Sequence, residues 1–263
     1  MKSFKILAAT ALAGTLAFLP AASIAQSFPS RPVTIVAPAP PGGTTDLAAR
    51  ALVEELGKAL GQPIVIENKG GANGVVGAQT MLNAPPDGHT LYMAFSGFHV
   101  ISPNLTKLPF DVIKDFQRVA LVYMALEVMV VRSSFSEIKN FQDLVNYAKR
   151  NPGKLNYGSA GTGSVAHVGK EMFKSLLDVQ IAHIPYKGTG QIVADLPGNS
   201  VDLALVSVPP LVGHIQSGKL RPLLFTSTGR QSAFPEVPTS TELGLKNFGV
   251  SSWVALYLSL IHI

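Results

Sequence analysis

The chain has 263 residues, of which 47% are hydrophobic and 14% charged, and it contains no cysteine. Disulfides, thiolate metal sites and cysteine nucleophiles are therefore excluded. The formal net charge of +5 comes from lysines and arginines that are scattered rather than clustered with aromatic residues. This distribution excludes a nucleic-acid footprint and is compatible with attraction of small anions.

The first 25 residues have the features of a secretory signal peptide. Lys2 and Lys5 precede an apolar run over 6–19, which ends at Pro20 and is followed by small residues up to Ala25. The run is too short to span a membrane, so we expect cleavage after Ala25 and export. Loss of the two lysines, with no acidic residue, lowers the formal charge from +5 to +3.

The first half of the remaining chain alternates short apolar strands with helices. We expect strands at 33–37, 63–67 and 90–95, separated by helices at 47–60 and 75–84. The first helix follows a Gly-rich turn in which Thr44, Thr45 or Asp46 can act as N-cap, and it carries an apolar stripe. Such alternation indicates a parallel sheet with right-handed crossovers.

The second half repeats this order after a long apolar run. Only Arg118 and Glu127 carry charge between 116 and 131, so we expect two strands, at 117–122 and 126–131, with a domain crossing between them. The elements expected next are helices at 141–150, 165–177, 191–196 and 210–217, and strands at 154–157, 180–185, 201–207 and 220–226. The last strand can carry the chain back, which predicts an α/β protein with domain 1 at 26–123, domain 2 at 124–222 and a return to domain 1 over 223–263.

The stretch 156–167 is a strand end, a Gly/Ser/Thr loop and the start of a helix. Its glycines allow positive φ and close approach of a ligand, and its hydroxyls suit an N-cap. The first N–H groups of the helix are free and lie at the positive end of its dipole. The loop 40–46 is of the same kind. Ligands collect at the carboxyl ends of parallel strands, so we expect an anion between the two loops.

Three functional interpretations of this loop compete with one another and with an ordinary turn. Gly161, Gly163 and Ala166 satisfy a dinucleotide fingerprint, but the next strand ends in 186–188 without an acidic residue for a ribose. A hydrolase nucleophile elbow around Ser159 fails because a tyrosine occupies position 157. A passive anion cradle needs only the residues already present, and an ordinary turn without ligand is the remaining alternative.

Several single residues have two interpretations. His167 and Glu171 have i, i+4 spacing that could ligate zinc, but no third ligand is signalled, and a helix-face pair is simpler. Asp46 either caps its helix or contacts an amine or hydroxyl of a ligand. Tyr186 and Lys187 either line the cleft or shape a turn.

A series of short motifs, in order, resembles a known family. The motifs are PPGGTTD at 40–46, NKGGANG at 68–74, PDGHTL at 86–91, KDF at 114–116, YGSAGTGS at 157–164 with His167, PYKG at 185–188, PEVPT at 235–239 and ELG at 242–244. Together they resemble the periplasmic solute-binding proteins of the tripartite tricarboxylate transporter system, the Bordetella uptake gene (Bug) family. The likeness extends over the mature chain up to Trp253.

The resemblance implies a two-domain Venus-flytrap fold of the type II periplasmic-binding-protein kind. It further implies a periplasmic monomer that holds a small carboxylate through backbone N–H groups and hydroxyls and passes it to a membrane permease, with no enzymatic activity, cofactor, metal or nucleic acid. The ligand-binding positions carried over are Gly42, Gly43, Thr44, Thr45 and Asp46 on one side, Ser159, Gly161, Thr162, Gly163 and Ser164 on the other, and Ser96 and Ser207 as further contacts.

Two other functions and one departure remain open. A sensory subunit that presents a ligand to a membrane kinase would have the same sequence features. A secreted serine hydrolase would use Ser159 or Ser164 with His167, although no acid is placed to orient the histidine. The family would continue after Leu256 into further helices, whereas this chain ends at Ile263, so we expect domain 1 to be truncated.

Overall fold

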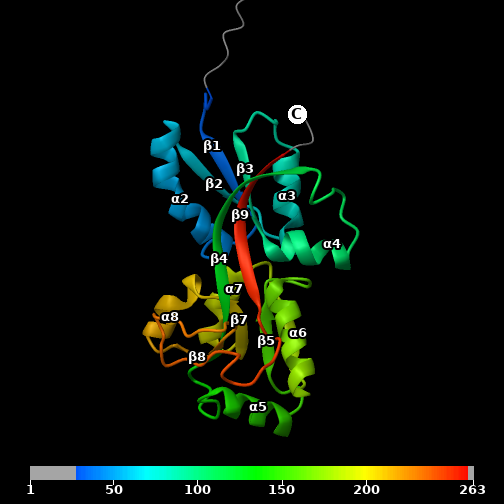
Figure 1. The fold of residues 1–263 in the computed structure, drawn as a ribbon, viewed down its shortest axis with the longest axis vertical. Helices are drawn as coiled ribbons and strands as arrows, with labels where there is room; N and C mark the ends of the chain where they lie inside the picture. The colour runs from blue at the N-terminus through cyan, green and yellow to red at the C-terminus, as the bar shows by residue number, and fades with distance from the viewer. Residues whose placement is uncertain (1–27, 260–263) are drawn as a thin grey trace, which may run out of the picture.

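The structure, a computed structural model, describes residues 28–259 and consists of two lobes joined by two long strands (Figure 1). The described strands form one nine-stranded mixed sheet in the order β2-β1-β3-β9-β4-β7-β5-β6, with β8 paired to β4. The expected signal peptide, its cleavage site after Ala25 and residues 260–263 lie outside the described residues.

In the first lobe the strands β2, β1 and β3 are parallel, β9 joins them antiparallel, and a helix covers each face of this sheet. The elements of this lobe are β1 (Val33–Ala37), α2 (Thr44–Leu60), β2 (Ile64–Asn68), η2 (Ala72–Gly74), α3 (Val75–Leu82), β3 (Thr90–Phe95), η3 (Gly97–Ile101) and α4 (Ser102–Leu105). Successive strand residues point to opposite faces. Ile35 and Met93 therefore pack with α2, whereas Val36 and Tyr92 pack with α3.

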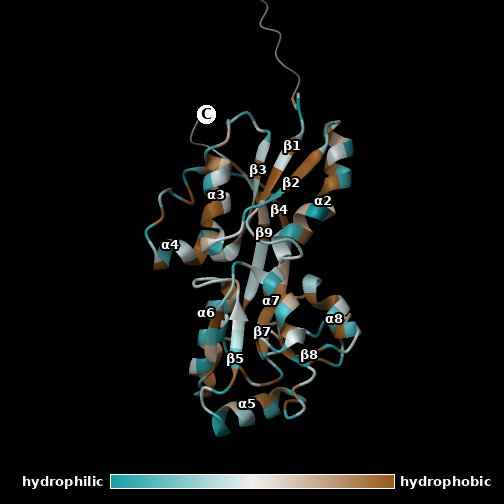
Figure 2. Cartoon of the chain, turned by 180° about the vertical axis from the view of Figure 1, so that it is seen from behind, coloured by the Kyte–Doolittle hydropathy of each residue, from teal (hydrophilic) through white to brown (hydrophobic). Residues whose placement is uncertain are grey.

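The second lobe repeats this arrangement. Its elements are α5 (Phe141–Arg150), β5 (Asn156–Ser159), α6 (Val165–Leu177), β6 (Ala182–Pro185), α7 (Thr189–Asp195), η4 (Leu196–Gly198), β7 (Leu203–Ser207), η5 (Pro209–Leu211), α8 (Val212–Gln216) and β8 (Leu220–Phe225). Leu205 of β7 packs in a core with residues of α5 and α6, and Ala204 packs with α7 on the other face. The central strand β7 is hydrophobic, whereas β5 is intermediate to hydrophilic (Figure 2).

The two lobes share the strands β4 (Phe116–Arg132) and β9 (Ser251–Ser259). β4 pairs with β9 as far as Leu126 and then, from Glu127, with β7 and β8. The prediction of two strands at 117–122 and 126–131 was wrong, because one strand of this length, at about 3.3 Å per residue, passes through both lobes. The two halves of β4 pack in the cores of different lobes. The apolar sequence of 116–131 therefore does not show that it forms one continuous strand.

The change of partner along β4 defines the lobes. We assign 28–126 and 251–259 to the first lobe and 127–250 to the second. The predicted return of the chain through the strand at 220–226 was wrong, since β8 pairs antiparallel with the second half of β4 and the return is made by β9. A pattern of apolar residues predicts that a strand forms but not which strand it joins.

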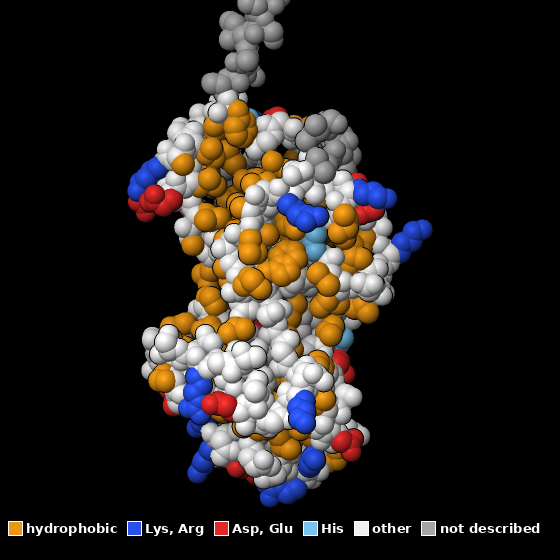
Figure 3. Space-filling model, in the orientation of Figure 1, with side chains coloured by type: hydrophobic (Ala, Val, Ile, Leu, Met, Phe, Trp, Pro, Cys, Tyr) orange, Lys and Arg blue, Asp and Glu red, His pale blue; other side chains and the backbone are white. Residues whose placement is uncertain are grey.

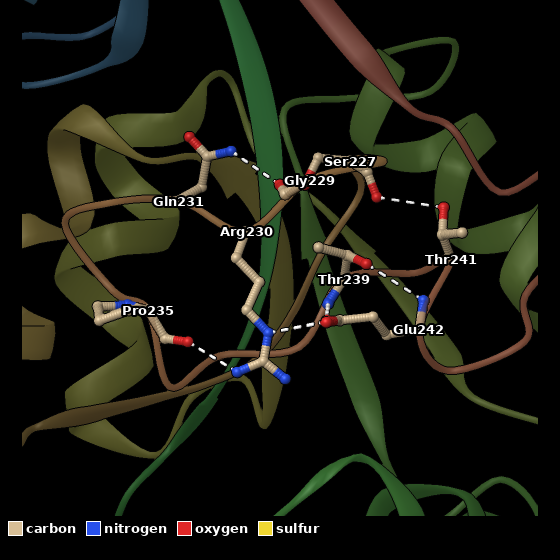
Figure 4. A network of polar contacts seen from close by, with 8 residues as sticks. All are labelled: Ser227, Gly229, Arg230, Gln231, Pro235, Thr239, Thr241 and Glu242. Carbon is tan, nitrogen blue, oxygen red and sulfur yellow. Dashed lines mark hydrogen bonds and ion pairs between the residues drawn. The ribbon is translucent and has the colours of Figure 1, made fainter.

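The segment between β8 and β9 is held by a polar network (Figure 4). Arg230 donates to Glu242 Oε1 at 2.8 Å and to the carbonyl of Pro235 at 2.8 Å. Thr239 and Glu242 exchange side-chain and backbone hydrogen bonds reciprocally, as in a capping box. These contacts fix the turns that carry the chain across the second lobe.

The α/β fold with two lobes that the sequence predicts is confirmed. The helices at 141–150 and 165–177 and the strands at 33–37 and 90–95 have the predicted bounds. α2 begins at Thr44 rather than 47, because Gly43 is its N-cap and no side chain caps it. Within residues 28–259, no helix combines the length and apolar character that a membrane crossing requires.

Candidate ligand-binding site

A cavity of about 80 Å³ lies between the two lobes. Its lining residues are Pro38, Ala39, Thr44, Thr45, Asn73, Gly74, Phe95, Glu127, Ala160, Ser164, Val165, Ala166, Lys187, Gly188, Thr189, Leu205, Val206, Ser207, Ser252 and Val254. Both lobes contribute, and the molecule narrows at this level (Figure 3).

The first wall of the cavity is the N-terminus of α2. Gly43 is the N-cap, and no side chain caps the helix. The Thr44 N–H donates to Thr189 Oγ1 of the second lobe at 3.0 Å. The Thr45 hydroxyl is buried and has no hydrogen-bond partner among the described residues. The first turn of α2 therefore presents donors to the cavity.

The opposite wall is the N-terminus of α6. Ser164 is the N-cap, and its hydroxyl accepts a hydrogen bond from the His167 N–H at 3.2 Å. Gly163 has a φ of +82°, a left-handed conformation that glycine adopts without strain and that turns the chain into the helix. Val165 and Ala166 bring the first turn of α6 to the cavity.

These two helix N-termini give the cavity a positive electrostatic character. Each carries roughly half an elementary charge, in addition to N–H groups that lack an intrahelical partner. Lys187 is the one basic side chain of the lining and is exposed. A small anion would thus be bound chiefly by backbone dipoles and hydroxyls rather than by a bidentate arginine.

Direct hydrogen bonds hold the lobes together around the cavity. The hydroxyls of Thr44 and Ser207 lie 2.6 Å apart across the cleft. Asn73 donates from Nδ2 to the carbonyl of Gly163 at 3.1 Å. The cleft is therefore closed, with the loops of the two lobes in contact.

The cavity also contains an acidic side chain, Glu127. It is 4% exposed, and Oε1 accepts a hydrogen bond from the Ser252 hydroxyl at 2.6 Å. Burial raises the pKa of Glu127 to about 7, against the opposing effect of the Ser252 hydrogen bond. In the sequence Glu127 is only a lone charge within an apolar run, and it is not among the predicted site residues.

Comparison with known proteins identifies the family. The model of the tripartite tricarboxylate transporter family receptor matches residues 48–259. The chain belongs to this family. A UPF0065 protein of Bordetella pertussis is 40% identical over 98% of this chain and 79% of its own length. Protein BugT of the same organism is 36% identical over 88% of this chain and 72% of its own length. The resemblance stated from the motifs is confirmed.

Solved structures of similar proteins have the same fold. The periplasmic binding protein BugD superposes with a TM-score of 0.84 at 35% identity, over 88% of this chain and 77% of BugD. Rpa4515 of R. palustris, solved with adipate, has a TM-score of 0.85 at 30% identity, over 90% and 79%. MatC from Rhodopseudomonas palustris, with bound malate, has a TM-score of 0.82 at 34% identity, over 88% and 79%.

The structure brings some of the predicted site residues to the cavity and leaves others behind it. Thr44, Thr45, Ser164 and Ser207 line it. The remaining predicted residues, which do not line it, are Gly42, Gly43, Asp46, Ser96, Ser159, Gly161, Thr162 and Gly163. Several of these shape the two loops, whereas Thr162 is exposed and Ser96 is buried next to the lining residue Phe95. The residues that the sequence did not indicate include Asn73, Glu127 and Thr189.

Asp46 holds the first loop in place. Its carboxylate is buried and accepts hydrogen bonds from the Gly42 N–H, Arg50 Nε and Asn68 Nδ2, each at 2.9 Å. Burial by itself raises the pKa of Asp46, but these hydrogen bonds outweigh it and hold the pKa below its ordinary value. The expected role as N-cap falls to Gly43, and Asp46 instead ties the loop to β2.

The serines and histidines of the second loop interact within the lobe. Ser159 Oγ lies 2.6 Å from His183 Nε2, and the His167 ring packs on His183 with centroids 4.4 Å apart. No carboxylate forms an ion pair with His183 in the part of the chain that the structure describes. Glu171 instead bonds the Tyr157 hydroxyl and Lys174. A serine hydrolase would need either serine paired with the His167 side chain, but no such pair is present among the described residues, and the third group of a catalytic triad is missing there.

Proposed function

We propose that this protein is a non-enzymatic solute-binding protein of the periplasm that captures a small organic carboxylate in the cleft between its lobes. The observation that carries the proposal is the convergence of the N-termini of α2 and α6 on one closed cavity. Helix N-termini bind carboxylates through free N–H groups and the helix dipole. The hydroxyls of Thr44, Thr45, Ser164 and Ser207 supply further donors.

Membership of the family supports delivery of the bound ligand to a transporter. A receptor of a tripartite tricarboxylate transporter would deliver its ligand to membrane permease subunits, and the similar proteins with adipate and malate bind small carboxylates. The amino-terminal sequence supports export with cleavage after Ala25. The ligand would be held by hinge closure of one lobe on the other, with β4 and β9 as the connecting strands.

Calorimetric titration tests the proposal. The panel contains succinate, malate, adipate, citrate and benzoate, and its matched controls are succinamide and adipamide, which lack carboxylates. We expect at least one acid to bind at one site per chain, with a dissociation constant of about 1 μM or tighter, and the amides to be silent. Absence of binding across these acids and their amino-substituted analogues, or equal binding of the amides, would contradict the proposal.

A further inference from the structure

Glu127 is held rigidly at the point where β4 passes from one lobe to the other. Its N–H donates to Thr226 Oγ1 at 3.1 Å, and its carbonyl accepts from the Thr226 N–H at 2.9 Å. In the antiparallel ladder it is opposite Ser207, which also lines the cavity. The backbone thus fixes the direction in which this side chain enters the cavity.

The carboxyl group of Glu127 is incompletely paired. Oε1 accepts the Ser252 hydroxyl, but the other carboxyl oxygen has no hydrogen-bond partner among the described residues. No lysine, arginine or histidine in the described part of the chain forms an ion pair with it. A buried charge without a partner is costly, so buried carboxylates are normally paired with a cation.

The cavity is therefore lined by two kinds of polar group. The α2 and α6 N-termini favour negative charge, whereas Glu127 is the one acid among the described lining residues and favours a cation or a hydrogen-bond donor. A ligand with a carboxylate and an ammonium group complements both the helix N-termini and Glu127. A hydroxyl could donate to Glu127 but would leave its charge uncompensated.

We propose that Glu127 is a specificity-determining residue that binds an ammonium group, so that the preferred ligand is a small amino acid in its zwitterionic form. This inference rests on the proposed carboxylate-binding function and narrows its substrate class. The ligand carboxylate would accept from the helix N-termini, and its ammonium would donate to the unpaired oxygen of Glu127. A plain dicarboxylate would place a second negative charge against this oxygen, which requires Glu127 to be protonated.

The other titratable groups near Glu127 do not supply this counter-charge. Burial raises the pKa of Tyr123 to about 12, so its phenol is neutral at pH 7. Lys187 lines the cavity but is exposed at its edge and makes no ion pair with Glu127. A cation that pairs with Glu127 would therefore come from the ligand.

A series of ligands that differ only at one carbon tests the inference by calorimetry. Succinate, malate and aspartate carry hydrogen, hydroxyl and ammonium, respectively, at that carbon. Two further pairs, propanoate with alanine and butanoate with 4-aminobutyrate, each compare an acid with its amino-substituted analogue. We expect aspartate, or another amine of these pairs, to bind at least about tenfold more tightly than its partner without the amine. The variant E127Q should abolish this preference, because its neutral amide cannot compensate the charge of an ammonium group.

The pH dependence of ligand affinity is a second measurement, and it would not change if Glu127 had only a structural role. A bound ammonium favours the ionised form of Glu127, so the affinity for the amino acid should rise between about pH 5.5 and 8. A dicarboxylate that needs protonated Glu127 would show the opposite slope. Both measurements on the wild-type protein stand even if E127Q does not fold, which thermal unfolding would reveal.

The outcomes separate the two proposals. If succinate binds as tightly as aspartate and the other pairs are also equal, or if E127Q keeps the preference for the amine, the inference is overturned and the proposed function stands. If no member of the series and no acid of the wider panel binds, both are overturned. A preference for the amines that E127Q removes supports both.

Discussion

Thr44 of α2 and Ser207 of β7 lie 163 residues apart in the chain, and their hydroxyls are 2.6 Å apart across the cleft. Both residues line the cavity, so this hydrogen bond both connects the lobes and borders the site. We expect this bond to contribute to closure. In a double-mutant cycle with Thr44→Ala and Ser207→Ala, the coupling in the free energy of unfolding should be about 0.5–1.5 kcal/mol. Additive effects in urea unfolding would show that the hydroxyls do not interact.

Gly190 of α7 touches the opposite loop so closely that a methyl group should hold the cleft open. A Cβ at this position would lie 2.6 Å from the carbonyl oxygen of Pro41 and 3.0 Å from the Gly43 nitrogen. We expect Gly190→Ala to increase the radius of gyration in small-angle X-ray scattering and to weaken ligand binding by about tenfold or more.

The matched control for Gly190→Ala is Gly213→Ala in α8. A Cβ at Gly213 meets nothing within 4 Å, so the substitution should leave the shape of the molecule and its affinity unchanged. Its higher helix propensity should raise the free energy of unfolding by up to about 1 kcal/mol. Equal scattering curves for both variants and the wild-type protein would exclude contact between α7 and the first loop.

The two serines of the second loop should respond differently to truncation. Ser164 lines the cavity and caps α6, so Ser164→Ala should cost about 1 kcal/mol of stability and weaken ligand binding by about fivefold or more. Ser159 points to His183, so Ser159→Ala should cost similar stability but change the affinity by less than about threefold. Calorimetry and thermal unfolding of both variants check this, and a reversed order of affinities would contradict the assignment.

Asp46 should support the first loop in a pH-dependent way. Because the hydrogen bonds lower its pKa in the folded state, its contribution is present above the unfolded pKa of 3.8 and is lost as the pH falls through the lower folded value. Asp46→Asn should lower the free energy of unfolding by about 1–3 kcal/mol at pH 7, and the difference from wild type should shrink toward about pH 3.

Urea unfolding at both pH values measures this difference for Asp46→Asn. Glu54→Gln serves as control because Glu54 forms an exposed pair with Lys58 on the same helix, and such pairs contribute little. A difference for Asp46→Asn that is the same at both pH values would show that its ionisation does not stabilise the loop.

The sequence predicts the elements whose apolar periodicity is decided locally. Helix α6 has its predicted bounds because its apolar residues recur with the helix period. Strand β3 has its predicted bounds because it is a short continuous apolar run that follows a turn. The start of α2 was misjudged because a backbone glycine replaces the expected side-chain cap. The pairing of β8 depends on a strand about a hundred residues earlier, which no local pattern contains.

The candidate site was predicted only in part for a related reason. The Gly/Ser/Thr loops indicate where two helices begin, so Thr44 and Ser164 could be found from the motifs. Glu127 lies inside an apolar strand, and its role depends on the crossing of β4 between lobes. In the sequence, Glu127 is a lone acid in a long apolar run. Its place in the site follows only once the strands that pair with β4 are known.

The most direct test of the central claim is a titration of the ¹⁵N-labelled protein with the tightest acid of the panel, followed by amide shifts in NMR. We expect the amides of Thr45 in α2 and Ala166 in α6 to shift together and to saturate with one dissociation constant, because both helix N-termini bind the same carboxylate. Unchanged Thr45 and Ala166 signals, with shifts confined to the groove beside Arg118 and Met124, would contradict the claim.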